Sequence, residues 1–215
     1  MPPKPAIAPL QIAVTTGTIS PFLTALLSKQ RAEEPQTPVH IVETSTEDQL
    51  RGLKDGRYCL GLSLATEKHY TRLQALPLWQ DELAVAVPPL SPLLRFSDIP
   101  LQEVIQYPLI MWRKGAFYPI DRQIKSLLDS TATQLNIVDW VESFELMMIL
   151  VAAGYGIGIH TKSRIKTLHG LDIVMRPLSG GTNLVKIYLN LPYQPLSEAA
   201  ERIVKRAKAI KLYSQ

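Results

Sequence analysis

Two patterns of hydrophobic and polar positions recur along the chain and predict a series of strands and helices. Short apolar runs at residues 10–14, 39–43 and 58–64 predict strands. Between them, residues 20–31 and 46–53 place apolar side chains three and four positions apart, which is the spacing of one helix face. Strands and helices that alternate with short loops favour parallel strands joined by right-handed crossovers.

Two helix starts are readable in this first series. Ser20 is followed by Pro21, which predicts a helix capped by Ser20, because proline at the first helical position loses no hydrogen bond. Thr46 and Gln49 fit a Thr-x-x-Gln capping box. They predict a second helix that Thr46 caps and that Gly56 ends.

A second series follows residues 73–87, which read as two extended segments and end at two prolines. Residues 107–112 and 135–140 predict strands, and Pro119 opens a helix between them. The remaining apolar patterns predict strands at 171–175 and 184–191 and a final helix with its apolar face between 196 and 207.

The stretch from 141 to 160, VESFELMMILVAAGYGIGIH, joins a helix directly to a buried strand. Glu142 and Ser143 are expected to cap this helix, and Gly154 to end it. The glycines of the strand at 156–159 leave room for close packing or for a bound ligand. The run GYGIG does not fit a dinucleotide-binding loop, because that loop lies between a strand and the following helix.

Composition narrows the class of protein. With 215 residues and 46% hydrophobic content, the chain can bury a sizeable core. It has no apolar run of membrane-spanning length and no secretory signal, so a cytoplasmic protein without membrane contact is expected. Cys59 is the only cysteine and the four histidines show no ligand spacing, so neither a metal nor a cofactor is expected.

The formal charge of +4 is concentrated near the end of the chain. Residues 198–211 hold five basic and two acidic side chains, and the rest of the chain is nearly neutral. A solvated basic helix end is the favoured interpretation, and a phosphate-binding patch is the alternative.

These patterns predict an α/β fold of two Rossmann-like lobes. We expect residues 1–9 to be a leader or the remnant of a linker, residues 10–86 and 182–215 to form the first lobe, and residues 87–181 to form the second. Two crossover strands would join the lobes. In open α/β sheets ligands bind outside the carboxyl ends of the strands, near helix starts that favour anions. Four such places are readable, at 16–20, 44–46, 113–118 and 142–144.

Four sequence segments in register resemble the effector-binding domain of LysR-type transcription regulators. They are LQIAV at residues 10–14, LRGLKDGRYCLGL at 50–62, DELAVAVPPLSPL at 81–93 and ILVAAGYGIGI at 149–159. The resemblance runs from about residue 10 to residue 210. Two departures from the family pattern are Cys59, where an aspartate is frequent, and His160-Thr161, where Leu-Pro usually closes the strand.

The resemblance implies a two-lobed architecture like that of type 2 periplasmic binding proteins, and a sensor that holds a small, anionic effector between the lobes. By position, it places ligand-binding residues at Thr16, Gly17, Thr18, Thr46, Trp112, Arg113, Phe117, Phe144 and Gly156. Each of these residues can also be explained by a structural role that needs no ligand. Thr46 can serve only as a helix cap, Phe144 as core, Trp112 and Phe117 as packing, and Arg113 as solvated surface.

The resemblance further implies a homodimer, or a tetramer in a full-length protein, which contacts DNA only through an N-terminal winged helix that this chain lacks. Alone, the chain is not expected to bind DNA specifically. A stand-alone or exported solute-binding protein of the same fold is the alternative. Residues 61–65, GLSLA, resemble a nucleophile elbow centred on Ser63, but no amphipathic helix follows, so an enzyme is not expected.

Overall fold

Two long strands carry the chain between two structural units. The computed structural model describes residues 8–64, 74–113, 119–131, 134–180 and 183–210. Unit 1 comprises Met1–Trp79 and Lys186–Gln215, and unit 2 comprises Gln80–Val185. The crossings therefore fall inside β4 (Gln74–Val87) and β9 (Leu184–Leu191), not at the expected boundaries of 86/87 and 181/182. A boundary inside a continuous strand leaves no loop signal in the sequence.

The sheet of unit 1 has the parallel order that the sequence predicts. β1 (Leu10–Val14) lies between β2 (Val39–Glu43) and β3 (Leu60–Leu64) and is parallel to both. β9 then pairs antiparallel with β3, and Gly61 lies opposite Asn190. Because β1, β2 and β3 run in one direction, their carboxyl ends meet at a single edge of the sheet.

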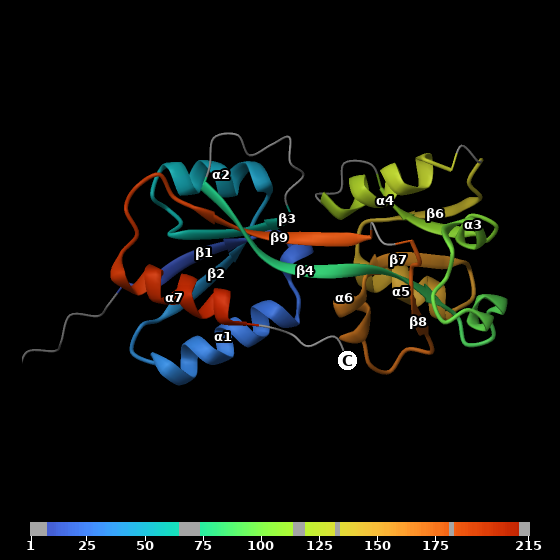
Figure 1. Cartoon of the computed structure of the whole chain (residues 1–215), viewed down its shortest axis with the longest axis horizontal. Coiled ribbons are helices and arrows are strands. Elements are labelled where there is room, and N and C mark those ends of the chain that lie inside the picture. The colour runs from blue at the N-terminus through green and yellow to red at the C-terminus, as the bar shows by residue number, and fades with distance from the viewer. Residues whose placement is uncertain (1–7, 65–73, 114–118, 132–133, 181–182, 211–215) are drawn as a thin grey trace, which may run out of the picture. The chain divides into compact units, whose positions relative to one another are not determined.

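Helices cover both faces of this sheet (Figure 1). α2 (Thr46–Lys54) packs on one face through Leu53, which lies in a buried cluster with Ala13 and Tyr58. α1 (Pro21–Glu33) and α7 (Glu198–Ala209) cover the other face. Here the Trp79 ring stacks on Phe22 with a centroid distance of 5.3 Å and donates from Nε1 to the Ala207 carbonyl over 3.1 Å.

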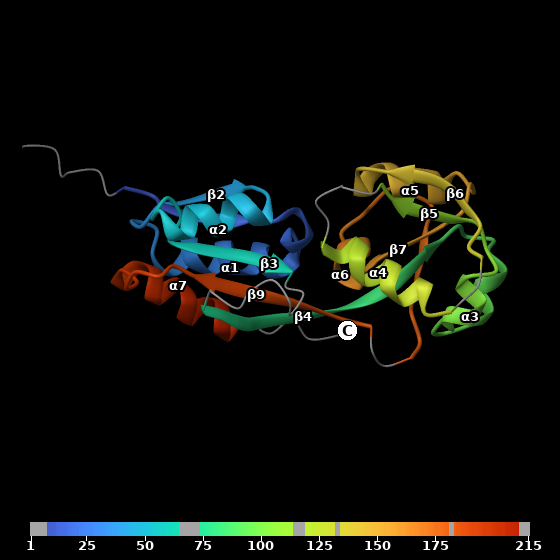
Figure 2. The same ribbon diagram turned by 90° about the horizontal axis from the view of Figure 1, so that it is seen from above.

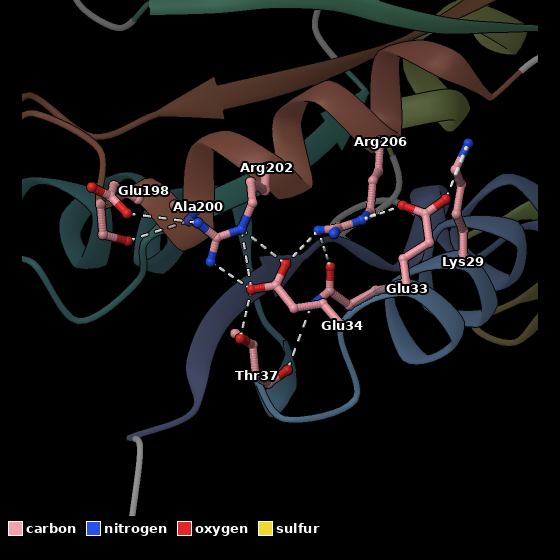
Figure 3. Close-up of polar contacts among 10 residues, drawn as sticks. Lys29, Glu33, Glu34, Thr37, Glu198, Ala200, Arg202 and Arg206 are labelled. Carbon is pink, nitrogen blue, oxygen red and sulfur yellow. Dashed lines mark hydrogen bonds and ion pairs between the residues drawn. The ribbon is translucent and has the colours of Figure 1, made fainter.

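Ion pairs fix α7 to the end of α1 (Figure 3). Arg202 Nε lies 3.1 and 3.0 Å from the two carboxylate oxygens of Glu34, and Arg206 Nη1 lies 2.8 Å from Glu34 Oε2. Hydrogen bonds from Arg202 and Thr37 lower the pKa of Glu34 from its usual 4.5 to about 2. The side chain of Arg206 is only 11% exposed and also pairs with Glu33. The expectation of a wholly solvated basic helix end is therefore wrong, because two of its arginines pair with acids of the α1 terminus.

Unit 2 repeats the parallel arrangement. β5 (Leu109–Trp112) lies between β6 (Ile137–Val141) and β7 (Ile157–Thr161) and is parallel to both. β4 pairs antiparallel with β7 on one side and with β8 (Val174–Pro177) on the other. α4 (Pro119–Asp129) and α5 (Phe144–Ala152) lie on opposite faces of this sheet (Figure 2). The α/β fold class predicted from the sequence is confirmed.

Some local predictions are wrong. Residues 73–87 were expected as two segments but form the single strand β4 within the described range. The sequence also gave no sign of the short helical turns η1 (Thr16–Thr18), η2 (Pro92–Arg95), α3 (Leu101–Val104) and α6 (Lys162–Lys166). Such short turns have too few residues to show a period.

The helix caps differ from expectation in two of three cases. Ser45, not Thr46, caps α2, with its hydroxyl accepting from the Asp48 amide over 3.1 Å. Ser20 precedes α1 in an extended conformation but makes no side-chain cap, since its hydroxyl donates to the Thr18 carbonyl. Ser143 caps α5 as predicted, and Gly154 ends that helix with a φ of 81°.

Candidate functional site

The carboxyl edge of unit 1 brings the η1 turn and the start of α2 together. Thr16 lies two residues after β1 and Thr46 three residues after β2. The Thr16 hydroxyl donates to Glu43 Oε1 over 2.7 Å, which ties the turn to the end of β2. The amides of Thr16 and Gly17 open a helical turn, and no acceptor for them is found among the described residues. The amide of Thr46 likewise opens α2 without an intrahelical partner.

Two residues of the η1 turn have structural roles. Thr18 is fully buried, and its hydroxyl donates to the Thr15 carbonyl over 2.7 Å. A Cβ on Gly17 would lie 2.5 Å from Cδ1 of Leu64, so a larger residue here would require the Leu64 side chain to shift. Thr18 and Gly17 therefore shape the turn, while its backbone amides supply the hydrogen-bond donors.

Acidic residues in the first turn of α2 are balanced by cations. Asp48 accepts hydrogen bonds from Arg57, Thr44 and Tyr58, and these bonds lower the pKa of Asp48 to about 2. Glu47 pairs with Arg51 over 3.1 Å. Because these acids are paired, the dipole of α2 is the main electrostatic influence left at the start of that helix. The dipole favours a bound anion.

A buried polar network lies beneath the same edge. Gln49 is fully buried and donates from Nε2 to the carbonyls of Ala13 (3.0 Å) and Leu62 (2.9 Å). Asn190 donates from Nδ2 to Gln49 Oε1 and to Ser63 Oγ, both over 2.8 Å. Ser63 therefore lies inside a strand with no exposed surface, and the strand-to-helix turn of a nucleophile elbow is not formed at this serine.

The carboxyl edge of unit 2 gathers aromatic side chains around a histidine. Trp112 ends β5, Phe144 opens α5, and His160 stands one residue before the end of β7. The His160 ring meets Phe144 and Trp112 edge-on, with centroid distances of 4.7 and 5.7 Å. Phe144 and Trp112 are only 4% and 1% exposed, so most of the surface of each side chain is packed in the core.

His160 is neutral in this surrounding. It is 4% exposed, and burial, with a smaller contribution from the Arg164 charge, lowers the pKa of His160 to about 3. Its Nδ1 accepts a hydrogen bond from the Thr161 amide over 2.7 Å. That bond leaves the ring proton on Nε2.

Each cation that the structure describes around this edge has a carboxylate partner. Arg113 lies 3.4 Å from Glu142, with both side chains exposed. Arg164 lies over the Phe144 ring and pairs with Glu145 at 3.2 Å. The exposed Arg113–Glu142 pair is weak, on the order of 0–1 kcal/mol, so an anion can compete for it.

Not all expected site residues meet at these edges. Thr16, Gly17, Thr18 and Thr46 lie at the unit 1 edge, and Trp112, Arg113 and Phe144 at the unit 2 edge. Gly156 is a correction: it precedes β7, where a Cβ would lie 2.7 Å from the Pro108 carbonyl oxygen, so it lies at the opposite, amino edge of the parallel strands. Phe117 falls outside the described residues.

The glycines of β7 serve packing. A Cβ on Gly158 would lie 2.9 Å from Sδ of Met147, so α5 packs directly on the strand at this glycine. Three site-edge residues, Glu43, His160 and Arg164, were not among the sequence candidates. Of these three, only His160 could have been noticed in the sequence, because it departs from the Leu-Pro that usually closes this strand in the family pattern.

Over the residues described, no three side chains of the types that bind metals come together as a metal site. None of the helices in the described part of the chain is long and apolar enough to cross a membrane.

Comparison with known proteins identifies relatives over most of the chain. The family model for the LysR substrate binding domain matches residues 6–209. A probable cat1 operon transcriptional activator from Acinetobacter lwoffii is 26% identical over 174 residues, 80% of this chain and 56% of the relative. The uncharacterized HTH-type transcriptional regulator YybE from Bacillus subtilis (strain 168) is 29% identical over 170 residues, 79% of this chain and 55% of the relative. The chain thus spans about half the length of these relatives.

Solved structures with the same fold include three informative cases. The BenM effector binding domain with its effector benzoate has a TM-score of 0.83 at 18% identity, covering 93% of this chain and 90% of that one. The effector binding domain of QuiR in complex with shikimate has a TM-score of 0.77 at 21% identity, covering 94% and 95%. Full-length CbnR complexed with its target DNA has a TM-score of 0.81 at 20% identity, covering 94% of this chain and 70% of CbnR.

Proposed function

The chain belongs to the family of LysR substrate-binding domains, and on that premise we propose that it senses a small organic acid and reports its binding to a DNA-contacting part outside this chain. The family consists of transcription regulators. Benzoate, the effector of one protein with this fold, and shikimate, which is bound in another, are both carboxylic acids. They support the class of ligand and do not identify it.

One observation carries the proposal. At the carboxyl edge of unit 1, the amides of Thr16, Gly17 and Thr46 lack acceptors among the described residues, and they open two helical turns whose dipoles favour an anion. The Thr46 hydroxyl is not used as a cap, because Ser45 caps the helix. We assign the effector carboxylate to these donors. Thr18 would support the turn without contacting the ligand.

The unit 2 edge holds the other residues that remain candidates for ligand contact. Arg113 can exchange its exposed partner Glu142 for a ligand oxygen, whereas Trp112 and Phe144 are almost fully buried against His160 and have little surface left for a ligand. Phe117 stays in the proposal through the family resemblance alone. Gly156 is left out because of its place at the opposite edge.

Self-association is part of the proposal. Five large apolar side chains of unit 2 are exposed on β6, on α5 and on the turn after α5, namely Val138, Trp140, Leu146, Ile149 and Tyr155. β6 is also an edge strand of its sheet. An exposed edge strand beside an apolar helix face favours covering by another chain. A homodimer, in which a second copy buries this patch, satisfies that requirement.

A thermal-shift screen tests the proposed function. Benzoate, shikimate and other small organic acids are added singly to the wild-type chain, and the acids that raise Tm are titrated by calorimetry. Thr46→Val removes a hydroxyl with little change of shape, whereas Thr46→Asp places a carboxylate beside the bound anion. Binding should weaken in the order wild type, Val, Asp. Thr24→Asp, at an exposed position of α1, is the matched control. Failure of every acid to raise Tm would contradict the proposal.

A further inference from the structure

Thr15 carries a buried hydroxyl that makes no hydrogen bond within the described part of the chain. The residue follows β1 directly and is 2% exposed. Its amide donates to the Leu62 carbonyl over 3.1 Å, and its carbonyl accepts from the amide and the hydroxyl of Thr18 over 2.8 and 2.7 Å. The backbone of Thr15 is therefore fully paired and only its side chain is not. An unpaired buried hydroxyl is destabilising, and such a group calls for a functional explanation.

The register of the unit 1 sheet places this side chain next to the start of α2. Thr15 has an extended backbone, with φ −88° and ψ 150°, so it shares a sheet face with Ala13, two residues earlier. Ala13 packs in one buried cluster with Leu53 of α2. The Thr44 amide donates to the Val14 carbonyl over 2.9 Å, so the chain that leaves β2 passes beside Thr15 just before it enters the helix.

The start of α2 is a place where an anion is favoured. The helix has nine residues, and the Thr46 amide at its first position has no acceptor among the residues that the structure describes. The neighbouring hydroxyls of Thr16 and Thr44 each donate to a carboxylate, at 2.7 and 2.9 Å. Thr15 thus differs from these two threonines, because its hydroxyl is still available to a partner from outside the chain.

From this arrangement we propose that Thr15 is a further ligand-contacting residue, whose hydroxyl donates to an oxygen of the anion bound at the start of α2. The inference rests on the proposed function and deepens it, because it adds a side-chain donor to the backbone amides assigned to the effector carboxylate. A carboxylate oxygen has lone pairs enough to accept from both an amide and a hydroxyl.

The burial of this hydroxyl has a consequence for binding. Because the hydroxyl is covered in this structure, it has to turn when the anion arrives. Rotation about χ1 of Thr15 exchanges its hydroxyl and methyl groups, which are nearly equal in size, so the turn needs little additional space. Without effector, the chain is then less stable than it would be with valine at this position, and the effector supplies the missing hydrogen bond.

Two buried threonines give a matched pair of stability tests. Without added acid, Thr15→Val replaces an unpaired hydroxyl by a methyl group, so the Tm should rise by roughly 2–4 °C. Thr18→Val removes a buried hydroxyl that is paired, so the Tm should fall. Calorimetric melts compare both variants with the wild-type chain. A Tm of Thr15→Val below that of the wild-type chain would show that the hydroxyl is already paired, and would overturn the inference without any ligand.

Binding should respond in the opposite direction. Benzoate, shikimate and each other acid that raises the Tm of the wild-type chain are titrated by calorimetry at millimolar concentrations. Thr15→Val should weaken binding about tenfold, the value of one hydrogen bond to a charged group. Thr15→Ser keeps the hydroxyl and should bind within about threefold of the wild-type chain. Thr24→Val, at an exposed position of α1, is the control and should leave binding unchanged.

Nuclear magnetic resonance tests the turn of the side chain. The three-bond coupling constants that report χ1 of Thr15 should change when the acid binds to the wild-type chain. The outcomes distinguish this inference from the function on which it rests. Equal binding of an acid by the wild-type chain and Thr15→Val, or an unchanged χ1 on binding, would overturn the inference and leave the organic-acid sensor intact. If no acid raises the Tm of the wild-type chain, both the inference and the proposed function fail.

Discussion

The side-chain amide of Asn190 donates to Oε1 of Gln49 over 2.8 Å, and this bond joins the crossover strand β9 to the helix that opens at Thr46. Gln49 in turn donates to carbonyls of β1 and β3. One fully buried glutamine thus fixes the start of α2 against the carboxyl edge of the sheet. Its position depends on Gly61, because a Cβ there would lie 2.7 Å from Cδ of Gln49.

Removal of the Asn190 amide should destabilise unit 1. Asn190→Ala leaves Gln49 Oε1 without its donor in a fully buried place, so the free energy of unfolding should fall by about 1–3 kcal/mol. Urea titration followed by circular dichroism measures the change. Asn136→Ala, at an exposed position, should cost less than about 0.5 kcal/mol. Equal effects of the two substitutions would show that the network contributes little.

The Glu34 cluster gives stability that depends on pH. The pKa of Glu34 is depressed from 4.5 to about 2 in the folded chain, so its contribution is complete above pH 4.5 and is lost as pH falls toward 2. Glu34→Gln should therefore be less stable than wild type at pH 6, and the difference should shrink between pH 4.5 and pH 2. Denaturant titrations at several pH values measure it. A difference that stays constant over this range would contradict the assignment.

The two hydroxyls at the start of α2 should separate stability from binding. Ser45→Ala removes the cap and should cost about 0.5–2 kcal/mol of stability. Thr46→Val leaves that cap in place and should change stability by less than about 0.5 kcal/mol, while it weakens binding of an acid found in the thermal-shift screen. A larger stability loss in Thr46→Val than in Ser45→Ala would show that Thr46 is the cap.

The apolar patch of unit 2 should control self-association. Ile149 is 51% exposed on α5, so Ile149→Asp should leave the fold intact and place a charge in the dimer contact. Light scattering should then show a particle of 24 kDa where the wild-type chain shows twice that mass. Leu90→Asp, at a 95% exposed position outside the patch, should remain dimeric. A monomeric wild-type chain at high concentration would rule out this interface.

The order of strands and helices could be predicted because each element has its own local signal. The bounds of β1, β2 and β9 agree with the apolar runs, and Gly154 ends α5 where the sequence predicts. The cap of α2 could not be assigned, since Ser45 and Thr46 are adjacent hydroxyl residues and the pattern does not decide between them.

Long-range contacts explain the remaining failures. Gln49 reads as part of a capping box, yet its amide reaches strands that are distant in sequence. Arg206 reads as solvated surface, yet it packs against Glu34 from the other end of the chain. Gly156 reads as a binding loop because local sequence does not show that Pro108, just before β5, lies against it. For each of these residues the local sequence suggests one role, but a contact with a residue distant in the sequence gives it another.

Native mass spectrometry of the chain, purified side by side with Thr46→Asp, tests the central claim most directly. The wild-type chain should carry a small organic acid that dissociates on activation, or take one up when the acids of the thermal-shift screen are added. Thr46→Asp should fold equally well but lose that ligand, because a second carboxylate then stands at the start of α2. A ligand retained equally by both chains would contradict the assignment of the effector carboxylate to the unit 1 edge.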